Sequence, residues 1–292
     1  MTRTASLLRV CGAYAVAVAV AVVWLVLGPS TDALWLDALI ADLLATLVIF
    51  AFSRIHKNSS FYDAYWSVVP PLLLLFWWTQ ADGVDAARCW LVAVVVVVWA
   101  VRLTANWVYT FPGLHHEDWR YPLLREQAGR FEFVADLGGI HVIPTIQVFL
   151  GCLPMYVAVT RSGRDVGIID VLAVLVGVGA VALELMSDLQ MHRFARERQP
   201  GQVMDQGLWS WSRHPNYFGE LSFWFSLALF GVAAAPGDTW WLFVGVLAML
   251  AMFLGASIPM MEQRSLERRP HYQDVIDRVP MLVPRPPRKT SV

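Results

Sequence analysis

The densest group of polar side chains lies in one segment, Gly207 to Glu220, directly before a long apolar run. Its core reads Arg-His-Pro-Asn-Tyr-Phe-Gly-Glu. The proline suits the first position of a helix, and Asn216 and Glu220 then lie four residues apart on one helical face. Gly219 between them leaves room for another backbone or a flat ligand. An amide and a carboxylate at this spacing can bind a ligand that offers both hydrogen-bond donors and acceptors.

Two interpretations of this segment are open. In the first, Glu220 lies just inside the membrane boundary, where an ionisable group is costly and indicates function, and Asn216 and Tyr217 bind a ligand beside it. In the second, the two tryptophans of the segment anchor at the lipid headgroups while Arg213 and His214 bind lipid phosphate. We expect the second role for the tryptophans and the first for Asn216, Tyr217 and Glu220, because headgroup anchoring needs neither an amide nor a carboxylate.

A second polar group closes an earlier apolar run. Glu184, Asp188 and His192 recur every four residues, so they share one helical face, and several arginines follow. Carboxylates beside a run of arginines can bind ribose hydroxyls and phosphates respectively. A solvated helix end with ion pairs between successive turns explains the same pattern, and both interpretations stay open. The candidate ligand-binding residues of this group are Asp188, Arg193, Arg196 and Arg198.

Smaller polar groups mark the ends of other apolar runs. Arg102 and Asn106 lie one turn apart at the end of one run. Asp63 precedes another run, where its simplest role is to partner a helix dipole. Asp42 is isolated inside an apolar run, and we expect it to form a hydrogen bond between helices. The charged C-terminal region contains Glu262 and Tyr272.

Several common types of site have no pattern in this sequence. There is no Walker loop, no Rossmann glycine pattern, no His-x-x-x-His pair and no Gly-x-Ser-x-Gly elbow. The seven histidines are dispersed, and the three cysteines lie in apolar runs without metal-ligand spacing. The net charge of −1 provides no basic field for nucleic acid. We therefore expect neither a metal centre nor a nucleic-acid partner.

The composition indicates an integral membrane protein. Of the 292 residues, 57% are hydrophobic and only 15% are charged, whereas soluble chains contain about 25% charged residues. A transmembrane helix needs about 20 mostly apolar residues. We predict an all-α fold, a polytopic transmembrane helix bundle with seven or eight spans. The eight candidate spans are Leu7–Leu27, Leu34–Phe52, Tyr65–Trp78, Ala87–Trp107, Ile140–Val159, Val166–Met186, Tyr217–Val232 and Trp240–Ile258.

The basic residues predict an orientation for this bundle. With eight spans and a cytoplasmic N-terminus, only Arg88, Arg161 and Arg164 of the 22 basic residues fall on the outer side. Such a bias is what the positive-inside rule predicts. We therefore expect both termini in the cytoplasm. Because most of the polar candidates lie on the same side, we expect the site to face the cytoplasm too.

The motifs in these segments resemble a known family. Gly207-Leu-Trp, Arg213-His-Pro-Asn-Tyr and Gly219-Glu are similar to the signature of the steroid 5-alpha-reductase-like membrane proteins of bacteria, a group catalogued as a domain of unknown function. The resemblance covers residues 60 to 285 approximately. We therefore predict an N-terminal transmembrane hairpin at 1–60 and a reductase-like transmembrane domain at 61–292. Further matching stretches are Asp63-Ala-Tyr-Trp, Arg102-Leu-Thr-Ala-Asn106, Asp118-Trp-Arg-Tyr121, Ser187-Asp188 and Gln199-Pro-Gly201, with the tail near Glu262 and Tyr272.

The resemblance implies an oxidoreductase of the bacterial inner membrane. Such an enzyme uses NADPH to saturate a carbon–carbon double bond conjugated to a carbonyl, in a lipid-like or steroid-like substrate. Steroid reductases polarise the carbonyl with a Gln-Glu pair and a tyrosine, but no Gln-Glu pair precedes residue 65 here, and Trp99 occupies the tyrosine position. Asp63 or Tyr65 would take the catalytic role instead. The cofactor-binding candidates are Arg102, Asn106, Asp188, Arg193, Arg196, Arg198, Arg213, His214, Asn216, Tyr217, Glu220, Glu262 and Tyr272.

Two other functions compete with the reductase. Arg-His-Pro-x-Tyr-x-Gly also occurs in isoprenylcysteine carboxyl methyltransferases and phospholipid methyltransferases, which bind S-adenosylmethionine. Those enzymes typically follow the motif with two adjacent glutamates, whereas this chain has Glu262-Gln263. The non-enzymatic alternative is a lipid-binding scaffold. These three functions, reductase, methyltransferase and scaffold, can be distinguished by testing whether NADPH, S-adenosylmethionine or neither stabilises the protein.

Overall fold

The computed structural model describes residues 2–161 and 164–286. Within these ranges the regular structure consists of helices, without strands. Seven helical runs are long and apolar enough to cross a membrane. This confirms the predicted all-α transmembrane bundle. The chain divides into two compact units, residues 1–163 (unit 1) and 164–292 (unit 2). The predicted domain boundary after residue 60 stays a prediction.

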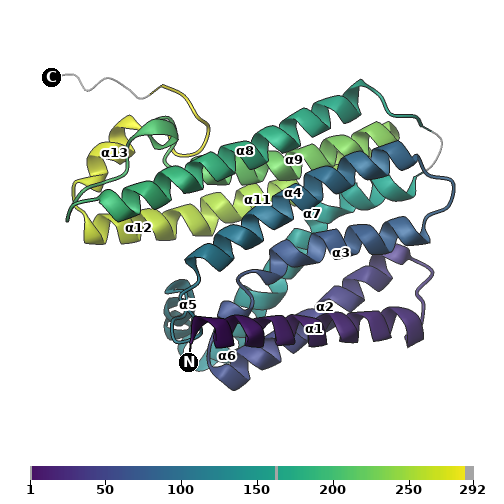
Figure 1. The fold of residues 1–292 in the computed structure, drawn as a ribbon, viewed down its shortest axis with the longest axis horizontal. Helices are drawn as coiled ribbons and strands as arrows, with labels where there is room; N and C mark the ends of the chain where they lie inside the picture. Colours follow the sequence, from purple (N-terminus) through teal and green to yellow (C-terminus); the bar gives the residue numbers. More distant parts are fainter. Residues whose placement is uncertain (1, 162–163, 287–292) are drawn as a thin grey trace. The chain divides into compact units, whose positions relative to one another are not determined.

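Unit 1 contains five long helices and a group of short ones (Figure 1). The long helices α1 and α2 pack side by side, and α3 contacts both α4 and α7. A π-helical segment, η3, leads directly into α7. The elements of unit 1 are α1 (Arg3–Leu27), α2 (Leu34–His56), η1 (Ser59–Phe61), α3 (Tyr65–Gln80), α4 (Ala86–Thr110), α5 (Arg120–Ala128), η2 (Gly129–Phe131), α6 (Glu132–Val134), η3 (Ala135–Val142) and α7 (Ile143–Thr160).

Local sequence signals explain where the helices of unit 1 begin and pack. The hydroxyl of Thr2 accepts from the Ala5 amide at the start of α1, and the Asp85 carboxylate accepts from two amides at the start of α4. Such caps satisfy donors that a helix leaves open. The helices α1 and α2, which pack together, each carry almost fully buried alanines, whose small size suits the close packing typical of membrane helices. These alanines are Ala13, Ala17, Ala38, Ala41 and Ala45.

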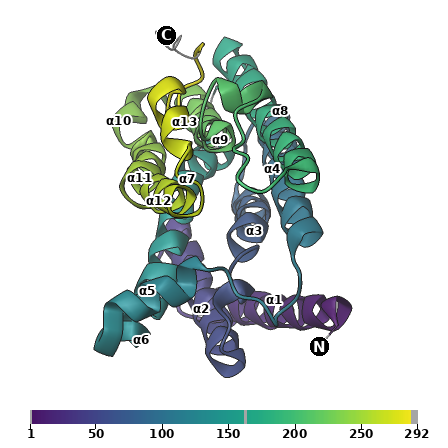
Figure 2. The ribbon, with the colours of Figure 1, turned by 90° about the vertical axis from the view of Figure 1, so that its left-hand side faces the viewer.

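Unit 2 is built around the pair α8 and α9, with the C-terminal helices beside it. Figure 2 shows α13 lying against α12, which it contacts. A second π-helical segment, η6, joins α11 to α12 and makes one long helical run. The elements of unit 2 are α8 (Ile168–Glu197), η4 (Gly207–Ser210), α9 (Pro215–Ala234), η5 (Pro236–Asp238), α10 (Thr239–Leu242), α11 (Val244–Met252), η6 (Phe253–Ser257), α12 (Ile258–Arg268) and α13 (Tyr272–Arg278).

Gly219 sets the spacing between α8 and α9. A Cβ atom at this position would lie 2.5 Å from Cγ of Glu184 and 3.1 Å from the carbonyl oxygen of Ala180, both on α8. Only glycine therefore allows this approach. The expected close approach at Gly219 is confirmed, and the neighbour is another helix.

The predicted spans correspond to helices of the structure, but several bounds differ. The helix α8 continues to Glu197, eleven residues beyond the predicted end at Met186. The third predicted span, α3, is a single helix of 16 residues that continues through Pro70 and Pro71 and is shorter than the seven other candidates. The last one extends as far as Arg268, ten residues beyond the predicted end at Ile258. Because of this extension, Glu262 lies on a helix. The cytoplasmic location of both termini stays a prediction.

Candidate functional site

An ionic clamp in unit 2 holds the segment that precedes α9. Arg213 donates from Nε and Nη2 to the two carboxylate oxygens of Glu262, at 2.6 and 3.3 Å. His214 Nε2 lies 3.0 Å from the same Oε1 atom. The side chains of Arg213 and Glu262 are only 6% and 13% exposed. The clamp therefore joins the start of α9 to α12 by a largely buried, charge-assisted interaction.

The C-terminal segment completes this clamp. The Nη1 atom of Arg213 donates to the carbonyl oxygens of Ile276 and Val279, at 3.0 and 2.6 Å. The backbone amide of Arg213 donates to the carbonyl of Pro280, and the Ser212 hydroxyl donates to that of Leu282 at 2.7 Å. Each nitrogen of the guanidinium thus has a protein acceptor. Arg213 therefore positions its neighbours, and its predicted contact with a cofactor stays a prediction.

Aromatic rings line one side of the clamp. The ring of Tyr217 stacks on His214, with centroids 5.4 Å apart, and on Phe253 of η6, at 4.6 Å and nearly parallel. Tyr272 is 9% exposed and packs with Val275 and Val279. Burial raises the pKa of Tyr272 to about 12, and the Glu262 carboxylate raises it as well. The structure therefore brings His214, Tyr217, Glu262 and Tyr272 together from three separate parts of the sequence.

Glu220 is buried on the inner face of α9. It is 7% exposed, and its Oε1 accepts from Trp224 Nε1 at 2.8 Å, one turn along the helix. Asn216 is half-buried at the start of the same helix. Gly219 lies between Asn216 and Glu220 on α9, and Glu184 of α8, which is 1% exposed, packs against it. The predicted pair on α9 thus lies beside a second buried carboxylate.

The loop before the clamp is anchored on α8. Gly207 has a φ of +58°, and a Cβ there would lie 2.5 Å from Oε1 of Gln190. That oxygen accepts from the Leu208 amide at 2.9 Å, and Trp209 Nε1 donates to the carbonyl of Ser187 at 3.0 Å. These contacts hold η4 beside Asp188, which is half-buried. Gln190 was not among the predicted residues. Its position half a helical turn after Asp188 is the one feature of the sequence that could have indicated it.

The predicted arginines at the C-terminal end of α8, Arg193, Arg196 and Arg198, are all exposed. Arg193 pairs with Glu197 one turn along, as the solvated-helix interpretation predicts. Partial burial lowers the pKa of Arg269, and the nearby charges of Arg198 and Arg268 lower it further. Three positive charges from two segments therefore converge beside Tyr272, which interacts with Arg269.

In unit 1 the two predicted catalytic side chains have different partners. The Tyr121 hydroxyl donates to Asp63 at 2.6 Å, and Trp107 Nε1 lies 3.4 Å from the other carboxylate oxygen. Burial raises the pKa of Asp63 to about 6. The Tyr65 hydroxyl instead donates to Asp42 of α2 at 2.9 Å, which confirms the expected interhelical bond of Asp42. The hydrogen-bond donor to the Asp63 carboxyl group is thus Tyr121, whereas Tyr65 donates to Asp42.

The remaining predicted candidates lie near Trp107 on α4. Arg102 and Asn106 are both half-buried, one helical turn apart. Thr104 between them forms a 2.9 Å hydrogen bond with Ser67 of α3, which fixes the rotation of α4. Tyr121 belongs to the Asp118-Trp-Arg-Tyr121 stretch of the family pattern. That stretch is the signal that could have identified Tyr121.

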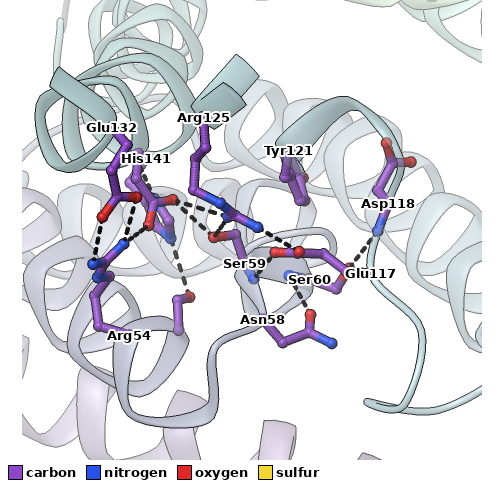
Figure 3. A network of polar contacts seen from close by, with 12 residues as sticks. Arg54, Asn58, Ser59, Ser60, Glu117, Asp118, Tyr121, Arg125, Glu132 and His141 are labelled. Atoms are coloured by element: carbon purple, nitrogen blue, oxygen red, sulfur yellow. Dashed lines mark hydrogen bonds and ion pairs between the residues drawn. The ribbon is translucent and has the colours of Figure 1, made fainter. Parts of the chain in front are cut away.

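A larger polar network occupies the C-terminal end of α2 (Figure 3). Arg54 contacts Glu132 at 2.9 Å and Asp136 at 3.0 Å. Arg125 binds Glu117 at 2.5 Å and the Ser59 hydroxyl at 3.1 Å. The other residues of the network are Ser53, Asn58, Ser60, Asp118 and His141. Asp136 and His141, on the π-helical segment η3, are almost fully buried, and π-helical segments are frequent at functional sites.

Comparisons with known proteins place the chain in a family. The family model described as "Protein of unknown function (DUF1295)" matches residues 49–279, which include most of the polar residues described above; Asp42, Pro280 and Leu282 lie just outside the match. The chain belongs to this family. It is also 26% identical to an uncharacterized protein of Schizosaccharomyces pombe over 263 residues, covering 82% of this chain and 76% of the relative. No solved structure matches the chain.

Proposed function

We propose that this protein is an integral membrane reductase that uses NADPH to saturate a carbon–carbon double bond conjugated to a carbonyl. The substrate would be lipid-like or steroid-like, since a helical membrane bundle admits apolar molecules from the lipid phase. The resemblance of the segment from Gly207 to Glu220 to the steroid 5-alpha-reductase-like group supports this proposal. Membership of the family of unknown function is consistent with it.

The observation that carries the proposal is the convergence of Arg198, Arg268 and Arg269. Like charges repel one another; solvent weakens this repulsion at the exposed Arg198 and Arg268, and the partial burial of Arg269 retains part of it. A ligand with several phosphate oxygens would offset this repulsion through charge-assisted hydrogen bonds. The pyrophosphate and the 2′-phosphate of NADPH supply such oxygens, whereas S-adenosylmethionine has none.

The rest of unit 2 would hold the other parts of the cofactor. Asp188 is beside the anchored loop and would bind ribose hydroxyls. Asn216 and Glu220 would bind the carboxamide of the nicotinamide, which needs both an acceptor and a donor. The clamp of Arg213, His214 and Glu262 keeps the start of α9 in place for that role. When bound, NADPH supplies the hydride for the reduction.

Asp63 is the proposed acid for the carbonyl oxygen. Its pKa of about 6 means that a useful fraction carries a proton near neutral pH. Tyr121 and Trp107 orient the carboxyl through their hydrogen bonds. Donation to the carbonyl oxygen would stabilise the negative charge that develops there, by about 3 kcal/mol in comparable sites.

A thermal-shift titration of the detergent-solubilised protein with NADPH, NADH and S-adenosylmethionine tests the cofactor. We expect NADPH to raise Tm more than NADH, since only NADPH has the extra phosphate. The double variant Arg198→Gln/Arg269→Gln should weaken NADPH binding at least ~10-fold, as for one or two charge-assisted bonds. The matched control is Arg130→Gln, which removes an exposed arginine of unit 1. It should leave the shift unchanged.

Two outcomes would replace the proposal. If S-adenosylmethionine raises Tm and NADPH does not, the methyltransferase interpretation is correct. If neither nucleotide changes Tm, the scaffold interpretation is favoured. If the double variant and Arg130→Gln show the same NADPH-induced shift in Tm, then Arg198 and Arg269 do not bind the cofactor.

A further inference from the structure

We propose that unit 1 contains an intramembrane proton-binding site at Asp42, connected by a chain of hydroxyl groups to the polar network at the C-terminal end of α2. One face of α2 carries Asp42, Thr46 and Ser53, all buried, and it faces polar side chains of α7 and η3. The proposal concerns a site apart from the cofactor and holds whether or not the protein is a reductase.

Asp42 is a buried carboxyl without a cation to neutralise it. Its side chain is 5% exposed and accepts from the Tyr65 hydroxyl. The other titratable groups that interact with it are Tyr62, from the turn before α3, and Cys152 of α7. Among the described residues, no arginine, lysine or histidine pairs with Asp42. An unpaired carboxylate inside a membrane is so costly that the group holds a proton instead.

Hydroxyl groups lead away from Asp42 along α2. Tyr65 interacts with the Thr46 side chain as well as with Asp42. Thr46 and Thr145 of α7 form a hydrogen bond of 3.0 Å, and Thr145 and Tyr62 form another of 2.8 Å. In both pairs either oxygen can be the donor. A hydroxyl that can donate and accept passes a proton on by receiving one and releasing another.

The chain reaches the polar network through His141. His141 lies one helical turn before Thr145, and its ring centroid is 5.1 Å from that of Tyr62. Its Nε2 atom is 3.1 Å from the Ser53 hydroxyl. Its Nδ1 lies 2.8 Å from the carbonyl oxygen of Asp136. The step from His141 to Thr145 needs one water molecule or a rotation of the imidazole. An imidazole that binds and releases a proton suits the entry to such a chain.

Asp136 connects His141 to groups that reach solvent. Its carboxylate accepts from Ser59 at 2.8 Å and from Arg54 at 3.0 Å. Arg54 and its other partner, Glu132, are 37% and 41% exposed. The Asp136 carboxylate lies 3.8 Å from His141 Nδ1, so a proton taken up by this carboxylate would reach the imidazole through one bridging water. Each group on the route then forms one O–H or N–H bond as it breaks another. Single hydrogen bonds between helices would account for isolated pairs of these residues, whereas the proposal rests on their forming one series from Asp42 to solvent-exposed groups.

Infrared spectroscopy of the full chain in lipid nanodiscs tests the site. We expect a protonated carboxyl band at neutral pH that is absent from Asp42→Asn. After transfer to D₂O, this band should shift as the proton exchanges for deuterium. Thr145→Val removes the central hydroxyl at nearly constant volume, and it should slow the exchange at least ~10-fold. The matched control, Thr104→Val, removes a partly buried hydroxyl that bonds to Ser67 and is not one of the hydroxyl groups leading from Asp42. It should leave the exchange rate unchanged.

Each result decides the proposal. If no protonated carboxyl band disappears in Asp42→Asn, Asp42 is ionised and the site does not exist. If Thr145→Val exchanges as fast as Thr104→Val, the hydroxyl chain is not the route. Should Thr145→Val fail to fold, as judged by gel filtration and circular dichroism, Thr46→Val interrupts the same Thr46–Thr145 bond from the α2 side. NADPH binding is expected to be unchanged in Thr145→Val, which separates this test from that of the reductase.

Discussion

The arginines of the two units have different partners. In unit 1, Arg54 and Arg125 are matched by the carboxylates of Glu117, Glu132 and Asp136, so that positive charge is neutralised within the network. In unit 2, Glu262 is shared between Arg213 and His214, while Arg198 converges on the arginines at the end of α12. The arginines near the end of α12 thus form a local positive group, whereas the network of unit 1 pairs its arginines with carboxylates. This difference is the basis on which we propose proton transfer within unit 1 and anion binding in unit 2.

The largest expected effect concerns the clamp of unit 2. Glu262→Gln leaves Arg213 buried beside a neutral partner, and breaking a buried pair in this way costs about 3 to 5 kcal/mol. We expect a corresponding loss in the free energy of unfolding, measured by chemical denaturation in detergent. A change below about 1 kcal/mol would mean that the clamp contributes no more than an exposed ion pair.

The next effect concerns the ligand-binding face of α9. Glu220→Gln keeps an oxygen for Trp224 and removes a buried charge, so the fold should be retained. NADPH binding or hydride transfer should fall by ~10- to 100-fold, about 1.4 to 2.8 kcal/mol, as for one charge-assisted hydrogen bond. Single-turnover kinetics and a binding titration measure the two steps. Normal binding and normal turnover together would assign Glu220 a structural role.

A smaller effect distinguishes Asp63 by its pH dependence. Because burial raises its pKa in the folded protein to about 6, the protonated form is favoured on folding. Its contribution to stability is therefore complete below about pH 4 and is lost as pH rises through about 6, by about 1 to 2 kcal/mol for this half-buried group. Unfolding curves of wild type and Asp63→Asn between these pH values should diverge in that direction. Parallel curves would show that Asp63 has an ordinary pKa.

The smallest effect is expected at the exposed pair on α8. Arg193→Gln removes an ion pair whose side chains are 75% and 63% exposed, and such pairs contribute about 0.5 kcal/mol or less. Neither the unfolding free energy nor the NADPH affinity should change measurably. A clear loss of NADPH affinity would extend the phosphate-binding group to this turn of α8 and would support the original sequence prediction for Arg193.

Candidate residues could be predicted where a single helix brings them together. Asn216, Gly219 and Glu220 lie on one helix, so their common face follows from the periodicity of the sequence. The pairing of Arg213 with Glu262 joins positions 49 residues apart and could not be predicted from either motif. For the same reason Tyr121, 58 residues from Asp63, was not recognised as its partner.

The sequence by itself determined the membrane-spanning helices, because long apolar runs must satisfy their backbone hydrogen bonds internally within a bilayer. It also determined the close approach at Gly219, since only glycine leaves that space. The tertiary structure decided the partner of each polar side chain. Asp63 and Tyr65 are two residues apart, yet one binds Tyr121 and the other Asp42. Their directions depend on the turn into α3 and on which neighbouring helices pack against it, and no local pattern specifies those contacts.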